Sequence, residues 1–205
     1  MNPSEVNDVL QKATVPEHSV PFMQAMSEGE TFLKGPYLFM AAEDWIIAIG
    51  YPLEGDYSPE AFKDALAGAL RQTRARDCWA VCPSLPDRLK PHMRQQDRYY
   101  VLPLDRRIPG LLERVSERAA ETLHVEESTV FTPEHRRLWA EFMTRDLPPN
   151  VLEMYARTES VLSRVSGLSL FNAWDNQGKL AASLLLDSAP ARFLTYLLGA
   201  HSRIH

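Results

Sequence analysis

Cysteine and long apolar runs are the features that this sequence has least of. Only Cys78 and Cys82 occur among 205 residues, and two cysteines four positions apart cannot supply a disulfide framework for a chain of this length. We therefore expect a reducing compartment, the cytoplasm. No stretch approaches the ~20 apolar residues that cross a bilayer, and the start of the chain lacks a basic segment followed by an apolar one. The sequence predicts neither secretion nor a membrane span.

The sequence also lacks an excess of positive charge. Its formal net charge is -5 and its pI is about 5.7, whereas nucleic acids and anionic lipids attract surplus Lys and Arg. We therefore expect no nucleic-acid partner. Hydrophobic residues make up 45% and charged residues 24% of the chain, which is typical of folded globular domains that bury a core.

The first half of the chain predicts strands that alternate with helices. Residues 1–35 favour a short helix and then an extended arm, and the aromatic and branched runs from Tyr37 to Gly50 predict a β-hairpin. Ser58 and Pro59 begin a predicted helix that runs to about Arg74. A short buried strand at Cys78–Cys82, a helix from Pro86 to about Gln96 and a strand at 99–104 follow. Both thiols are expected to be reduced and mostly buried.

The second half predicts helices followed by an antiparallel meander. Helical spacing runs through residues 111–123, from Thr132 onwards, and from Asn150 to about Val165. Beyond Gly167 the apolar period becomes two. Three strands are expected there, at 168–174, 179–186 and 192–198, with turns at 175–178 and 187–190.

Details of this second half resemble a known superfamily. The run Asn172–Ser183, which turns at Gly178, resembles a hairpin of GNAT-type acyltransferases, while Tyr196–Ser202 and Phe131–His135 resemble parts of the Fem-like branch. Bacterial proteins of that branch contain two acyltransferase-like domains. The resemblance implies an α/β (α+β) fold with GNAT-like mixed sheets flanked by helices. It divides the chain into an arm (1–35), a reduced first unit (36–106) and the front half of a second unit (107–205).

The resemblance also implies an activity. An amine, from a small molecule or a peptide, would attack an acyl thioester or aminoacyl ester, and the donor would be acetyl-CoA or another acyl-CoA. A homodimer is a further expectation. The residues that it assigns are catalytic His201 and Tyr196, donor-binding Leu198, Gly199 and Ala200, and substrate-binding Glu153 and Tyr155. Each assignment has an alternative without a functional role. Tyr196 would be a packed core aromatic, His201 would lie in a solvent-facing turn, and 153–155 would belong to an ordinary exposed helix face.

One departure weakens the assignment of an enzyme. In such folds a phosphate-binding loop and a helix follow the strand that corresponds to 192–198, but this sequence ends at His205. We expect either a longer protein or an incomplete active site. Arg107–Gly110 matches the loop signature only in half, and a plain turn is the alternative. A binding or scaffolding module without catalysis is therefore the competing hypothesis.

The remaining candidates favour structural or solvated roles. Cys78 and Cys82 have no second pair or paired His that would complete a zinc site, so no metal is expected. His124 and His135 are interpreted as surface residues. A basic cluster surrounds one short helix and is interpreted as a solvated face; it comprises Arg88, Lys90, Arg94 and Arg98.

Overall fold

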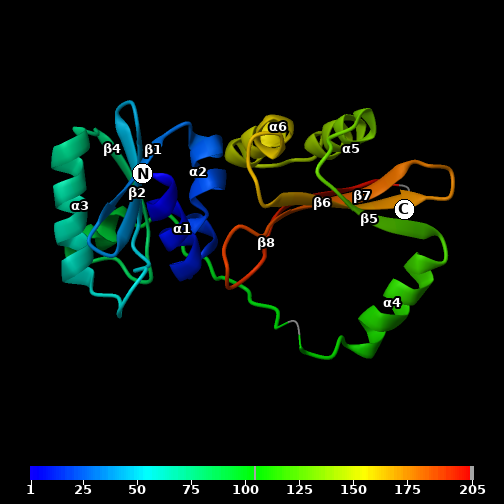
Figure 1. Cartoon of the computed structure of the whole chain (residues 1–205), viewed down its shortest axis with the longest axis horizontal. Coiled ribbons are helices and arrows are strands. Elements are labelled where there is room, and N and C mark those ends of the chain that lie inside the picture. The colour runs from blue at the N-terminus through cyan, green and yellow to red at the C-terminus, as the bar shows by residue number, and fades with distance from the viewer. Residues whose placement is uncertain (104, 204–205) are drawn as a thin grey trace.

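The computed structural model describes residues 1–103 and 105–203 and contains two four-stranded sheets (Figure 1). The helices are α1 (Pro3–Lys12), η1 (Pro16–His18), α2 (Val20–Ser27), α3 (Pro59–Thr73), η2 (Asp87–His92), α4 (Gly110–Ala120), α5 (Pro133–Met143) and α6 (Pro149–Leu162). The strands are β1 (Glu30–Lys34), β2 (Tyr37–Ala42), β3 (Trp45–Ile49), β4 (Asp77–Val81), β5 (Leu123–Ser128), β6 (Leu168–Asp175), β7 (Leu180–Asp187) and β8 (Thr195–His201).

Sheet A contains β1 to β4 in sequence order. The first three strands pair antiparallel, which confirms the predicted hairpin, and β3 pairs parallel with β4 across the α3 crossover. The N-terminus of α3 forms as predicted, because the Ser58 side chain accepts a hydrogen bond from the amide of Ala61 and Pro59 occupies the first turn. The helix ends at Thr73 and is capped by Arg74, whose φ of 58° is left-handed.

Two predictions in the first half are wrong in detail. Residues 13–35 form η1, α2 and β1 rather than an extended arm. Cys78 is exposed and Cys82 is only half-buried, and the side chain of Trp79 is 70% exposed. The reason is that β4 is the last strand of sheet A, so its outer edge has no neighbouring strand among the described residues. An apolar run alone does not distinguish a covered central strand from an edge strand.

The strand predicted at 99–104 does not form within 99–103, and Leu104 lies outside the described residues. The chain is held there by a side chain instead. The Tyr99 hydroxyl donates to the Glu17 carboxylate at 2.8 Å, and its ring lies 5.6 Å from that of Tyr51. The predicted helix before it shortens to η2, which contains Pro91 and buries none of its residues fully; Leu89 alone among them is partly buried against the core of sheet A.

Sheet B contains β5 to β8 in sequence order, with every pair antiparallel. Its last three strands confirm the predicted meander. The predicted helix at 111–123 ends at Ala120, and β5 follows where no strand was expected. β5 has polar residues on both faces, which hides its period of two.

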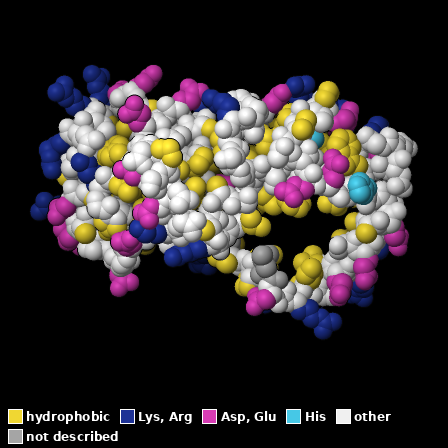
Figure 2. Space-filling model, in the orientation of Figure 1, with side chains coloured by type: hydrophobic (Ala, Val, Ile, Leu, Met, Phe, Trp, Pro, Cys, Tyr) yellow, Lys and Arg dark blue, Asp and Glu magenta, His cyan; other side chains and the backbone are white. Residues whose placement is uncertain are grey.

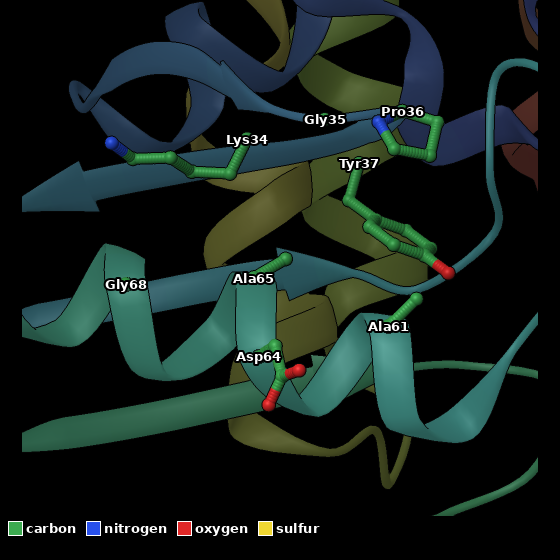
Figure 3. A pocket seen from close by; sticks show the side chains of 8 residues that line it. All are labelled: Lys34, Gly35, Pro36, Tyr37, Ala61, Asp64, Ala65 and Gly68. Atoms are coloured by element: carbon green, nitrogen blue, oxygen red, sulfur yellow. The ribbon is translucent and has the colours of Figure 1, made fainter.

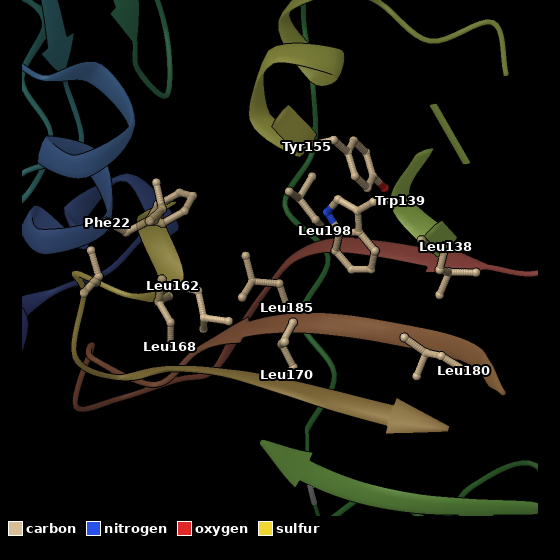
Figure 4. Packing of buried hydrophobic residues seen from close by; sticks show 13 residues of the cluster. Phe22, Leu138, Trp139, Tyr155, Leu162, Leu168, Leu170, Leu180, Leu185 and Leu198 are labelled. Carbon is tan, nitrogen blue, oxygen red and sulfur yellow. The ribbon is translucent and has the colours of Figure 1, made fainter. Parts of the chain in front are cut away.

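Helices α5 and α6 cover one face of sheet B (Figure 1). Leu138 and Trp139 of α5 pack with Leu170, Leu185 and other side chains that point upward from the sheet in Figure 4. Phe22 of α2 joins the same cluster. The N-terminal helices therefore contribute to the core of sheet B although they precede sheet A in the chain.

Candidate functional site

The candidate site lies along β8, which is the terminal strand of sheet B. The register of β8 with β7 shifts between Leu185 and Leu186, which marks an irregularity opposite residues 196–198. Leu198 and Ala200 point into the buried core. Of these two predicted donor-binding residues, only the backbone atoms could therefore contact a ligand. Such a contact would form at the outer edge of β8, which has no strand partner among the described residues.

Gly199 lies at the centre of this site. Its carbonyl oxygen accepts a hydrogen bond from the Tyr155 hydroxyl at 2.5 Å. A β-carbon at Gly199 would lie 2.7 Å from the Tyr196 hydroxyl and 2.8 Å from a methyl group of Leu184. Its φ is not left-handed. Glycine is thus needed here for space rather than for backbone conformation, because the ring of Tyr196 folds back over it.

The two tyrosines differ in their access to solvent. Tyr155 is buried against the rings of Trp139 and Phe142, whereas the side chain of Tyr196 is 61% exposed. Partial burial raises the pKa of both hydroxyls above the ordinary value. Both groups are therefore protonated at neutral pH, and Tyr196 is the one that could donate a proton to a bound molecule.

His201 ends β8 beside an arginine that the sequence did not single out. The Arg145 guanidinium lies 3.1 Å from His201 Nε2 and donates to the His201 carbonyl oxygen at 3.2 Å. His201 Nδ1 lies 3.0 Å from the carbonyl oxygen of Ser202. This pattern assigns the hydrogen to Nδ1 and the lone pair to Nε2. A proton can reach that lone pair only after Arg145 moves.

The structure brings together only some of the predicted site residues. Tyr155, Tyr196, Gly199 and His201 lie on or against β8. Glu153 instead pairs with Arg157 at 2.8 Å, and Arg157 also donates to the carbonyl oxygen of Met26 in α2. The substrate-binding roles of Glu153 and Tyr155 and the catalytic roles of Tyr196 and His201 remain predictions.

His135 is not a surface residue as predicted but is fully buried. Its Nε2 donates to the Asn172 side-chain oxygen at 2.9 Å, and Nδ1 accepts from the Thr132 amide at 3.1 Å. Ser183 donates to the same Asn172 oxygen at 2.8 Å. Burial lowers the pKa of His135. The sequence did contain a signal for the position of His135. Thr132 is an N-cap residue and His135 lies three positions later, and the two form a capping box at the start of α5.

One hollow of about 460 Å³ lies away from β8, between α3 and the β1–β2 turn, where Tyr37 and Asp64 are among the lining residues (Figure 3). Its lining is mostly small or apolar and contains no catalytic constellation. Within residues 1–103 and 105–203, no group of three or more His, Cys, Asp or Glu side chains could hold a metal ion. Among the helices of the same residues, none has both the length and the apolar character that crossing a bilayer demands.

Comparisons with known proteins identify the fold. Models of known protein families give no match, and neither do the curated proteins. Among solved structures, the chain is similar to the C-terminal domain (DUF2156) of an Agrobacterium fabrum protein described as a lysylphosphatidylglycerol synthetase. The TM-score is 0.52 at 13% identity, over 100% of this chain and 70% of that chain. The chain therefore shares the overall fold of that domain.

That likeness confirms the predicted fold class, with mixed sheets flanked by helices. It is a likeness of fold, and it places no substrate in this chain. The division of the chain near residue 107 remains a prediction.

Proposed function

We propose that this chain is an N-acyltransferase of the Fem-like branch that transfers an acyl or aminoacyl group to an amine. The observation that carries the proposal is the arrangement at Gly199. A residue without a side chain lies on a terminal strand, its carbonyl is held by Tyr155, and the protonated hydroxyl of Tyr196 folds over it. In addition, the fold is one in which acyl transfer is a known chemistry.

The proposed reaction uses the free edge of β8. The donor lies along 198–200, where backbone amides can polarise its carbonyl and stabilise the oxyanion that forms. The amine nitrogen bonds to this carbonyl carbon, and the carbon–sulfur or carbon–oxygen bond of the donor breaks. Tyr196 donates a proton to the leaving group. The proton lost by the amine goes to His201 once Arg145 has moved, or to water.

The residues at the end of β8 fit an acyl-CoA in part. The Tyr196 ring and a methyl group of Leu184 fill the space over Gly199, so a thioester would reach the backbone there once the exposed Tyr196 side chain swings away. The cations Arg145 and Arg203 border the same strand end, where they could neutralise phosphates. When bound, coenzyme A would supply an activated acyl group. We further propose a cytoplasmic, bacterial setting, a small-molecule or peptide amine as acceptor, and a homodimer.

One observation favours the alternative of a non-catalytic binding module. The lone pair of His201 that a base would use is already occupied by Arg145. If that contact persists with a ligand bound, β8 offers a binding edge without a base on its own strand. The proposed enzyme therefore requires the contact to open.

Calorimetry with acetyl-CoA tests the proposal. The Gly199→Val variant is expected to weaken binding at least tenfold, because the new side chain collides with Tyr196 and Leu184 and permanently blocks the backbone that the donor would contact. The matched control is Gly68→Val, since nothing lies closer than 3.9 Å to a β-carbon there. Circular dichroism checks that both variants fold. Equal affinity in wild type and Gly199→Val would contradict donor binding at β8, and no affinity in the wild type would favour the module or another donor.

A further inference from the structure

The face of sheet B opposite α5 and α6, here called the far face, is mostly apolar, and none of the described elements covers it. Side chains alternate between the faces of a strand, so the neighbours of the buried residues Leu170, Asn172 and Leu185 point to the far face. Leu184 is 42% and Val125 62% exposed. The far face comprises Val125, Glu127, Phe171, Ala173, Ala182, Leu184, Leu186 and Tyr196.

Helix α4 carries an apolar stripe that also has no cover. Helical spacing places Leu111, Leu112, Val115 and Ala119 on one side, and none of the residues of α4 is buried. Glu113 and Glu117 lie on the opposite side of the helix. In Figure 2 an opening separates α4 and the segment leading to it from sheet B, and hydrophobic side chains lie along its edges.

We propose that α4 docks onto the far face, over β5 and β6. The two apolar surfaces belong to one chain, and only Glu121 and Thr122 connect α4 to β5. Helix–strand connections of two residues are common in compact domains, and one this short keeps α4 close to its own sheet. Docking would remove both surfaces from water while Glu113 and Glu117 stay solvated.

The dimensions of the two surfaces agree. An 11-residue helix is about 16 Å long, and a strand of six residues such as β5 spans about 20 Å. A helix about 10 Å wide covers about two strands spaced 4.8 Å apart. When α4 runs back along β6, Val115 lies at the level of the Val125–Ala173 pair, and Leu112 lies nearer to Leu184.

The helix of the same chain is a better occupant than that of a second copy. A short tether gives α4 an effective concentration in the millimolar range at its own sheet. A second copy must reach the same face from a dilute solution, and an 11-residue helix offers little area for a stable dimer. The docking itself is independent of the proposed function.

Disulfide trapping tests the docking. In a background with Cys78→Ser and Cys82→Ser, the pair Val115→Cys with Ala173→Cys is expected to form an intramolecular disulfide under copper–phenanthroline. The pair Leu112→Cys with Leu184→Cys provides a second site if the first variant does not fold. The matched control is Glu113→Cys with Ala173→Cys, which places the thiol on the opposite side of α4. We expect the first pairs to oxidise at least tenfold faster than the control.

Equal oxidation rates for the stripe and control pairs would overturn the proposal, because they would show a helix with no preferred face. Disulfides found only in covalent dimers would assign the far face to a second copy.

Discussion

At the residue scale, His18 makes the stability of the protein sensitive to acid. It is fully buried, its Nδ1 accepts from the Thr14 amide at 3.1 Å, and its Nε2 donates to the Tyr51 carbonyl at 3.0 Å. Burial lowers its pKa from 6.5 to about 4. The neutral form is therefore the one that the fold accommodates. Its contribution is complete above pH 6.5 and is lost as the pH falls from 6.5 towards 4.

We expect acid to remove the advantage of wild type over His18→Gln. Between pH 7 and pH 5 the difference in their free energies of unfolding should shrink by about 2 kcal/mol. Urea denaturation at several pH values measures it. His92→Gln is the control, because His92 is exposed, and its difference from wild type should stay constant. A pH-independent difference for His18→Gln would contradict the assigned burial.

Asn172 accepts hydrogen bonds whose contributions to the free energy of unfolding can be compared by substitution. Its side-chain oxygen accepts hydrogen bonds from both His135 and Ser183. Asn172→Leu leaves two buried donors without a partner and is expected to cost about 2–4 kcal/mol of unfolding free energy. Ser183→Ala removes one bond without leaving Asn172 oxygen unpaired, so about 1 kcal/mol is expected. Similar costs for the two variants would show that the cluster contributes by packing alone.

At the element scale, the position of β4 at the edge of sheet A determines how its cysteines react. Cys78 is exposed and Cys82 is half-buried. We expect a thiol reagent to modify Cys78 of the native protein several-fold faster than Cys82, because accessible thiols react first. Mass spectrometry of timed samples measures both rates. Equal rates, or protection of both thiols, would show that β4 is covered in solution.

The elements also show what the sequence could predict. The meander, the hairpin and the starts of α3 and α5 followed from period-two runs and from N-cap residues, which are local signals. β5 was missed because its apolar alternation covers only Leu123 and Val125 before Glu127 ends it, and because Leu123 also continued the helical spacing of the preceding residues. A strand was predicted at 99–104 because its run is apolar, yet the contact of Tyr99 with Glu17, far earlier in the chain, decides its path. Tertiary contacts of this kind leave no local pattern.

In the candidate site, too, local features could be predicted from the sequence and tertiary contacts could not. The small residues at the end of β8 are visible in the sequence. The contact of Arg145 with His201 joins the α5–α6 connection to a strand 56 positions later, and no local spacing indicates it. For His135 the capping signal was present, but burial depended on Asn172 in β6.

At the scale of the whole molecule, α2 connects the two sheets. Phe22 packs into the core of sheet B, and the backbone of Met26 in α2 accepts a hydrogen bond from Arg157 of α6 at 2.7 Å. α2 also lies against β1 of sheet A. A substitution that weakens the packing of α2 should therefore also destabilise sheet B, although the two are distant in sequence.

We expect Phe22→Ala to cost about 3–5 kcal/mol and to lower amide protection in β6 and β7 by hydrogen exchange. The control is Phe32→Ala, because Phe32 packs against Phe39 within sheet A, and protection in β6 and β7 should then be retained. If Phe22→Ala leaves the protection of sheet B unchanged, α2 does not stabilise it.

The pairing of β5 with β6 has a consequence for the order of folding. β6, β7 and β8 are joined by short turns, so each can pair with the next soon after it is made. Ser128 of β5 must instead find Leu170 of β6, and closing a loop of about forty residues carries a larger entropic cost. During synthesis β5 leaves the ribosome before its partner strand, and it stays unpaired until α5, α6 and β6 have been made. The nascent chain therefore exposes an unpaired strand beside the apolar stripe of α4, and this interval is when it most needs protection from association with other chains.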